Sequence, residues 1–188
     1  MEYQLIRSAR KTMAIQVKDG KVFVRVPLRA GKREIDAFVK RHAKWIEKAL
    51  ARSADNAKKR QEEVDNAGKI TDTQIRALAN AALKTIPERV RYFAPLIGVN
   101  YGRITIRNQS SRWGSCSAKG NLNFNCLLML APPNVLDSVV VHELCHRLEM
   151  NHSSRFYEHV YKYCPDYDEC RKWLKTEGSL LLARRETS

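Results

Sequence analysis

Residues 136–148 constrain the fold of this chain more than any other segment. Large apolar residues recur there at every fourth position: Leu136, Val140, Leu144 and Leu148. That spacing is typical of a helix that buries one stripe in a core. The same segment contains His142 and His146, which are also four residues apart and therefore differ by about 40° around a helix. We expect a helix that packs its apolar stripe inward and presents two imidazoles to a cleft.

Two imidazoles at this spacing can bind a single metal ion. A catalytic zinc site takes three protein ligands and keeps one position open, so a third ligand is needed. His152 is the best candidate, because the spacing H-E-x-x-H-x-x-E-x-x-H matches the metzincin motif except that Glu149 replaces a glycine. We therefore expect a different turn, in which Asn151, a residue that tolerates the left-handed region, ends the helix. The second choice of third ligand is a later carboxylate: Glu158, Glu169 or Glu177.

The residue types around the histidines predict metal-assisted hydrolysis. Zinc lowers the pKa of its water to about 7, and Glu143, beside the first histidine, can accept a proton and return it to the leaving group. Arg112, in the polar loop 108–117, is a candidate for stabilising the developing oxyanion. The alternative for Arg112 is a solvated charge or a structural ion pair. We expect His159 to be solvated or to support the site indirectly, and His42 to be structural.

A β-hairpin is predicted near the start of the chain. Two segments of alternating apolar and polar residues flank Asp19-Gly20, which is a strong signal for a two-residue hairpin turn. A helical spacing of apolar residues follows over residues 34–50, and we expect its Trp45 face to pack on the hairpin. The two strands are predicted at residues 12–18 and 21–27.

A domain boundary is predicted near residue 70. Residues 51–69 are rich in alanine and charge and have few large apolar groups, which indicates a solvated helix or a connector. Residues 1–70 carry 18 Lys and Arg against 9 Asp and Glu. We therefore expect a basic N-terminal segment of hairpin and helix at 1–70, followed by a second domain at 71–188.

The second domain combines helices and strands, so its class is α+β. Thr71 or Asp72 can cap a helix, which Pro87 interrupts or bends. Pro132-Pro133 can start the helix that carries the histidines. Strands are predicted at residues 103–107 and 121–128.

Composition narrows the classes of partner. The net charge of +14 and the pI of about 9.8 favour anionic partners. No apolar run is long enough to span a membrane, and the N-terminus lacks a secretory signal pattern, so we expect a soluble cytoplasmic protein that does not bind a membrane. The five cysteines include no C-x-x-C pair, which argues against disulfides and a cysteine-built zinc knuckle. Most are expected to be small core residues.

Several sequence blocks occur together: RWGSC at 112–116, VHELCH at 141–146 and NHS at 151–153, with Asn125 and Phe156, and N-terminally Arg7, Arg10, Lys11, Thr12, Trp45 and Ile46. Together they resemble the YgjP-like metal-dependent hydrolase family, which is related to the WLM zincin-like metallopeptidases. The resemblance implies a zincin-like core of helices packed on a small antiparallel sheet, preceded by the basic hairpin and helix. It also implies His142, His146 and His152 as metal ligands, Glu143 as catalytic base, and the 112–116 loop near the site.

The substrate remains open between a peptide and a nucleoside triphosphate. A peptidase needs an edge strand that aligns an extended peptide, and residues 122–125 could serve. A nucleoside-triphosphate pyrophosphohydrolase, for example one acting on UTP, needs cations for the phosphates. The chain offers several: Arg7, Arg10, Lys11, Arg103, Arg107 and Arg112.

Two further hypotheses come from other classes. One is a nucleic-acid-associated metalloprotease, because the positive charge favours non-specific nucleic-acid binding, with Trp45, Trp113, Tyr101 and Trp173 as candidate stacking residues. The other is a structural zinc domain with Cys145 as an added ligand, against which helix phase argues. Zinc is the expected cofactor, although nickel or manganese could replace it in a three-histidine site.

Overall fold

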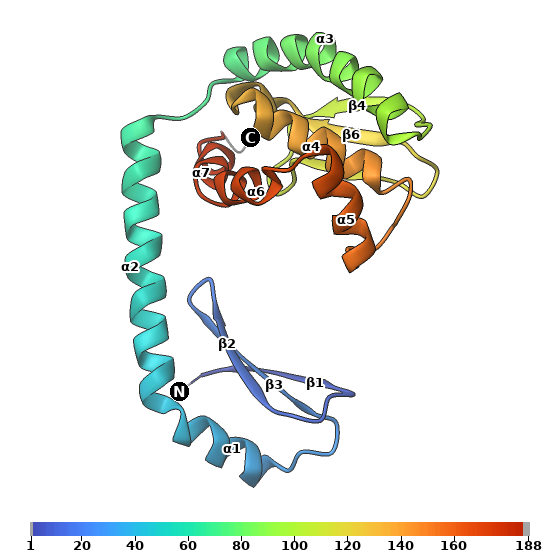
Figure 1. Cartoon of the computed structure of the whole chain (residues 1–188). Helices are drawn as coiled ribbons and strands as arrows, with labels where there is room; N and C mark the ends of the chain where they lie inside the picture. Colours follow the sequence, from blue (N-terminus) through green and yellow to red (C-terminus); the bar gives the residue numbers. More distant parts are fainter. Residues whose placement is uncertain (1, 186–188) are drawn as a thin grey trace. The chain divides into compact units, whose positions relative to one another are not determined.

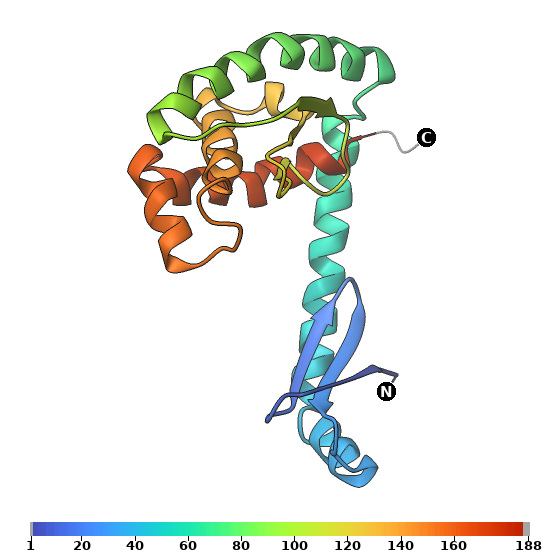
Figure 2. The same cartoon turned by 90° about the vertical axis from the view of Figure 1, so that its right-hand side faces the viewer.

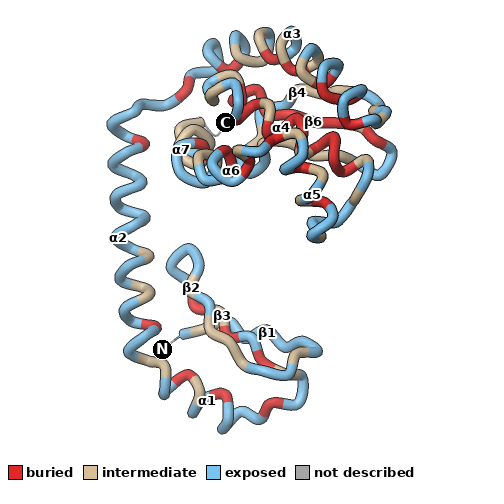
Figure 3. Tube along the Cα trace, in the orientation of Figure 1, coloured by how far each residue is buried: buried red, intermediate tan, exposed pale blue. Residues whose placement is uncertain are grey.

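The computed structural model describes residues 2–185 and divides the chain into two compact units, Met1–Glu63 and Val64–Ser188. Each unit has a hydrophobic core of its own, visible as separate groups of buried residues in Figure 3. The domain boundary that the sequence predicts at residue 70 stays a prediction.

The first unit contains a three-stranded sheet with strand order β1-β3-β2 (Figure 1). Strands β2 and β3 form the predicted antiparallel hairpin. Its turn places Asp19 at φ 50° and Gly20 at φ 70°, the left-handed conformations that a tight two-residue turn requires. Strand β1, which the sequence analysis did not predict, pairs in parallel with β3. The bounds are β1 (Gln4–Ser8), β2 (Ala14–Lys18) and β3 (Lys21–Pro27).

The helix predicted after the hairpin is two helices, α1 (Lys32–Arg41) and α2 (Ala43–Ala67). They break at His42, whose Nδ1 lies 2.8 Å from the carbonyl oxygen of Phe38 at the end of α1. Trp45 lines a surface pocket together with Val17 of β2, and the residue stays 50% exposed. The next residue, Ile46, is fully buried instead. The core of this unit consists of Val22, Val24, Val26, Ala30, Ile35, Val39 and Ile46.

Helix α3 (Asp72–Ile97) is the first helix that lies wholly within the second unit. It begins with the predicted cap. Thr71 Oγ1 accepts a hydrogen bond from the backbone N–H of Gln74, and Gln74 Oε1 accepts one from the backbone N–H of Thr71. Pro87 lies inside the helix and does not interrupt it. A proline removes one backbone hydrogen bond, to the carbonyl four residues earlier. That residue, Leu83, is 58% exposed, so water can reach this turn.

The sheet of the second unit has three strands in the order β4-β6-β5. Strand β4 is parallel to β6 and β5 is antiparallel to it, so the sheet is mixed, with one antiparallel and one parallel pair. Strand β5 falls in the segment expected to be an irregular loop. The predicted strand 121–128 is shorter, because a 3-10 helix, η1 (Cys126–Leu130), follows directly. The strands are β4 (Ile104–Arg107), β5 (Gly114–Cys116) and β6 (Leu122–Asn125).

Helix α4 (Pro133–Cys145) is the centre of the second unit and contacts α3, α5, α6 and β5. Figures 1 and 2 both show α3 on the outer side of α4, with α5 and α6 on other sides. Arg89 of α3 forms a two-pronged ion pair with Asp137 of α4, at 2.6 and 2.7 Å. The fold is α+β, as predicted. The last helices are α5 (Ser154–Tyr163), α6 (Tyr167–Lys175) and α7 (Glu177–Ala183). In residues 2–185, no helix has the length and apolar character needed to cross a membrane.

Candidate metal centre

Helix α4 has the two-sided character that its sequence predicts. Leu136, Val140 and Leu144 are buried in the core of the unit. Leu148 does not continue this stripe, because α4 ends at Cys145 and Leu148 lies beyond it with 40% of its surface exposed. His142 lies in the last turn of α4 and His146 immediately after it.

A tight turn returns the chain to the two histidines. Beyond α4, the amides of Leu148 and Glu149 donate to the Cys145 carbonyl, at 2.9 and 3.0 Å. Asn151 does not adopt the left-handed conformation expected of it, since Asp19 is the one described non-glycine residue with positive φ. Ser153 then caps α5 by accepting from the Phe156 amide. His152 stands directly before this cap and is thereby held close to α4.

The structure brings the three predicted histidines together. One ring nitrogen from each of the three lies within 4.8 Å of the other two. The Nε2 atoms of His142 and His152 are 3.1 Å apart. A tetrahedral ion with bonds of about 2.0–2.1 Å would hold its nitrogen ligands roughly 3.3 Å apart, so the donor set fits a divalent transition metal. Among the described residues, the candidates that do not join this cluster are His159, Glu158, Glu169 and Glu177.

Hydrogen bonds determine which ring nitrogen of His142 and of His146 is available to bind a metal. His146 Nδ1 donates to the backbone carbonyl of Glu149 at 3.1 Å, which leaves Nε2 with its lone pair. His142 Nδ1 lies 2.7 Å from the hydroxyl oxygen of Tyr167 in α6. A bond from Nδ1–H to that oxygen likewise leaves Nε2 free. Such a partner on the distal nitrogen is the usual arrangement for a metal-binding histidine.

The ring of Phe156 fixes the spacing of the three imidazoles. It is fully buried, and its centroid lies 4.9, 4.6 and 4.8 Å from the rings of His142, His146 and His152. The apolar ring of Phe156 therefore packs against all three imidazoles and restricts how far each of them can rotate.

Burial dominates the electrostatics of the site. Burial lowers the pKa of His142 to about 3, and the nearby His146 and His152 act in the same direction. Burial also lowers the pKa of His146. These imidazoles are therefore neutral at pH 7, as metal ligands must be. Burial raises the pKa of Glu143 to about 8, and the positive charge of Arg112 opposes that shift.

Glu143 packs directly against the backbone of β5. A Cβ added to Gly114 would lie 2.6 Å from Glu143 Oε1, so this close approach requires glycine. Arg112, Gly114, Glu143 and the three histidines line one cavity of about 270 Å³. A second cavity of about 230 Å³ adjoins it and is lined also by Trp113, Val139, Tyr167 and Leu174.

The loop that carries Arg112 is held by Asn125, which is fully buried at the end of β6. The Asn125 side-chain amide donates to the backbone carbonyls of Gln109 and Arg112, at 2.8 and 2.9 Å, and its oxygen accepts from the Leu127 amide. In the sequence, Asn125 stands out only as part of the family resemblance, and no pattern indicates a role for Tyr167. Neither role follows from residue spacing, because each depends on a contact between elements: Asn125 holds the loop of Arg112, and Tyr167 contacts His142.

Comparison with known families is consistent with this site. The family model described as YgjP-like, metallopeptidase domain, matches residues 11–72 and 65–177. The chain belongs to the YgjP-like family. It is therefore a metal-dependent hydrolase, and the resemblance seen in the sequence is confirmed.

Two solved structures are also similar to part of this YgjP-like chain. The metallopeptidase zymogen jannalysin of Methanocaldococcus jannaschii is 21% identical, and the match covers 50% of this chain and 97% of that one, with a TM-score of 0.45. The zymogen abylysin of Pyrococcus abyssi is 18% identical over 50% of this chain and 96% of that one, with a TM-score of 0.43. No curated protein matches the chain significantly.

Proposed function

We propose that this chain is a zinc-dependent hydrolase of peptides, with His142, His146 and His152 as the metal ligands. The observation that carries the proposal is the convergence of these three imidazoles beside the buried carboxyl group of Glu143. Zinc is preferred because three neutral imidazoles with one open position are typical of catalytic zinc sites. The cytoplasm remains our prediction for where the protein acts.

Each residue of the site has a distinct part in the proposed reaction. A divalent metal in such a site acts as a Lewis acid and makes water easier to deprotonate. The positive charge of a bound metal would counter the burial that raises the pKa of Glu143, so that its carboxylate would accept the proton of the attacking water and return it to the leaving nitrogen. Arg112 at the cavity wall supplies positive charge for the developing oxyanion. Among the described residues, Arg112 forms no ion pair, so its charge is available for this purpose.

An extended peptide fits the sheet edge at this cavity. Residues 122–125, which were the candidate for that part from the sequence, form β6, and this prediction is wrong because β6 is the central strand and is paired on both sides. Strand β5 is the edge strand on the side of the histidines, and its three residues, Gly114–Cys116, line the cavity with them. A substrate strand can pair with this free edge through backbone hydrogen bonds and so bring its scissile bond to Glu143.

The basic residues offer less support for a nucleotide. Of the three candidate phosphate-binding arginines in the second unit, Arg112 lines the cavities at the histidines, whereas Arg107 belongs to β4 at the opposite edge of the sheet. Hydrolysis of a nucleoside triphosphate such as UTP, and proteolysis that depends on bound nucleic acid, are therefore alternative outcomes of the test below.

The test compares Glu143→Gln with Glu158→Gln as a matched control. Glu158 is an exposed carboxylate on α5 outside the histidine cluster. Each protein is assayed for metal content and for turnover of an unstructured protein, with and without single-stranded DNA, and of a nucleoside-triphosphate panel. We expect Glu143→Gln to reduce protein cleavage by at least about 100-fold with unchanged metal content. Glu158→Gln should retain both.

Three outcomes would contradict the proposal. In the first, the unmodified protein hydrolyses a nucleoside triphosphate but does not cleave protein, and Glu143→Gln loses the triphosphate turnover. This result would identify a nucleotide hydrolase. Cleavage only in the presence of DNA would identify a nucleic-acid-associated protease. Full protein cleavage by Glu143→Gln would exclude Glu143 as the base.

A further inference from the structure

A second cluster of potential metal ligands lies where α5 meets α6. It consists of Cys164, which ends α5, Asp166, which begins α6, and Cys170 one turn into α6. One donor atom of each residue lies within 4.8 Å of the other two. None of these residues belongs to the histidine centre, and the proposed hydrolysis does not use them.

The carboxylate of Asp166 lies between the two thiols. Cys164 Sγ donates to Asp166 Oδ1 at 3.3 Å, and Cys170 Sγ lies 3.6 Å from Asp166 Oδ2. Both cysteines are buried, whereas Asp166 is partly exposed. The three side chains therefore converge from a short corner of the chain, and one of them opens the cluster to solvent.

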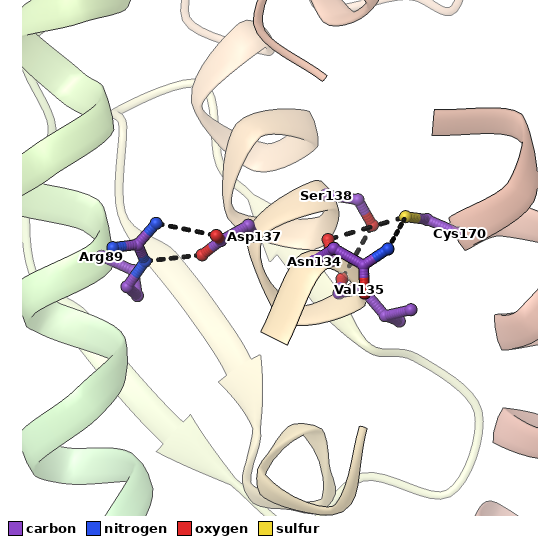
Figure 4. A network of polar contacts seen from close by, with 6 residues as sticks. All are labelled: Arg89, Asn134, Val135, Asp137, Ser138 and Cys170. Atoms are coloured by element: carbon purple, nitrogen blue, oxygen red, sulfur yellow. Dashed lines mark hydrogen bonds and ion pairs between the residues drawn. The ribbon is translucent and has the colours of Figure 1, made fainter. Parts of the chain in front are cut away.

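Helix α4 completes the surroundings of the cluster. The Asn134 side-chain amide donates to Asp166 Oδ2 at 3.0 Å and lies 3.6 Å from Cys170 Sγ. Figure 4 shows Asn134 and Ser138 of α4 directed at the Cys170 thiol. The orientation of the carboxylate is thus fixed from a separate element, as is typical of ligands held in place for an ion.

The chemistry of the thiols favours a metal over a nucleophile. Burial raises the pKa of Cys164 and of Cys170, and the negative charge of Asp166 raises both further. A reactive cysteine needs the opposite environment, one that stabilises the thiolate. The negative field that opposes ionisation of the thiols attracts a cation, and two sulfurs with one carboxylate oxygen suit zinc.

We propose that Cys164, Asp166 and Cys170 form a second metal site, which binds a thiophilic divalent ion such as zinc through two sulfurs and one carboxylate oxygen. On binding, both S–H bonds break, two metal–sulfur bonds form, and the two protons pass to solvent. No electron is transferred, so no oxidant is required. The site closes the corner between α5 and α6 directly before Tyr167, whose hydroxyl group contacts His142.

Cobalt(II) tests this site separately from the histidine centre. Cobalt bound by thiolates gives an intense sulfur-to-cobalt charge-transfer absorption in the near ultraviolet, which imidazole ligands alone do not give. The metal-free, reduced full chain is titrated with Co²⁺ and followed by absorption. We expect two equivalents to bind and the charge-transfer band to appear.

Variants assign the band to its residues. Cys170→Ser should abolish the band and leave one equivalent bound, and Asp166→Asn should weaken binding at this site at least about 10-fold. His152→Ala should retain the band. Cys116→Ser is the matched control, because Cys116 lines the histidine cavity, and it should retain the band too.

Three results would overturn the second site. The first is that the unmodified protein binds one equivalent of Co²⁺ and shows no charge-transfer band. This result does not depend on the folding of any variant. The second is a band that Cys116→Ser removes and Cys170→Ser keeps. The third is a count of three thiols instead of five in the purified, denatured protein without reductant, with the missing pair mapped to a Cys164–Cys170 disulfide.

Discussion

At the scale of single residues, the orientation of two imidazoles decides whether the cluster can bind a metal. His146 is oriented by a backbone carbonyl of its own turn, but His142 depends on the Tyr167 hydroxyl group from a different helix. Without that contact the His142 ring could take the other tautomer and present N–H to the ion. Tyr167 is therefore a positioning residue for the site.

Tyr167→Phe tests this role. The substitution removes one oxygen atom from a buried side chain, and we expect the zinc affinity of the histidine site to fall about 10- to 100-fold. Competition against a chromophoric chelator measures the affinity. Tyr161→Phe is the control, because the Tyr161 hydroxyl group donates to Asp168 and not to a histidine. Equal zinc affinities for the Tyr167→Phe and unmodified proteins would show that Tyr167 does not orient His142.

The sequence predicted the residues that share one helix and its following turn. His142, Glu143 and His146 could be found because their helical spacing is visible in the chain, and His152 because a known motif spacing reaches it. Phe156, Asn125 and Tyr167 were given no function from spacing. Their contacts depend on how α5, α6 and β6 pack around α4, which no local pattern encodes.

At the scale of elements, the site depends on how closely β5 approaches α4. Gly114 is the point of contact, since its missing side chain leaves room for Glu143. A strand edge that lies this close to the carboxyl group can hold a substrate backbone within reach of the same carboxyl group. The geometry of the proposed reaction is thus set between two elements rather than within one.

Gly114→Ala should separate these elements and displace Glu143. The new Cβ would be 2.6 Å from Glu143 Oε1, and a displacement of about 1 Å can reduce a rate on the order of 100-fold. We expect kcat to fall to that extent while zinc content stays unchanged. Gly31→Ala is the control, because a Cβ there meets no atom within 4 Å and Gly31 has no positive φ. Unchanged kcat in Gly114→Ala would mean that Glu143 has more freedom than this packing allows.

The sequence predicted long, capped elements better than short ones. The Thr71 cap and the Asp19-Gly20 turn are local signals, and both elements form where predicted. Of the two effects predicted for Pro87, an interruption or a bend, the interruption is wrong, because burial of Ile86 and Val90 holds α3 together across the proline. Strand β5 has three residues, too few to show an alternating pattern, and only its pairing with β6 makes it a strand.

At the scale of the whole molecule, the candidate site and the larger share of the positive charge lie in different parts of the chain. The candidate metal centre lies entirely in the second unit, built on a core shared by α3, α4, β6 and η1. The more basic first third has a small core of its own in the first unit. Net charge could indicate anionic partners, but it could not locate the site, which depends on helix packing.

Anomalous diffraction at the zinc edge, from crystals of the zinc-loaded protein, directly tests whether the three histidines bind zinc. We predict a peak about 2.0–2.1 Å from the Nε2 atoms of His142, His146 and His152, with Glu143 close by but outside the coordination sphere. A peak bound by Glu158, Glu169 or Glu177 in place of His152, or no peak among the three imidazoles, would contradict it.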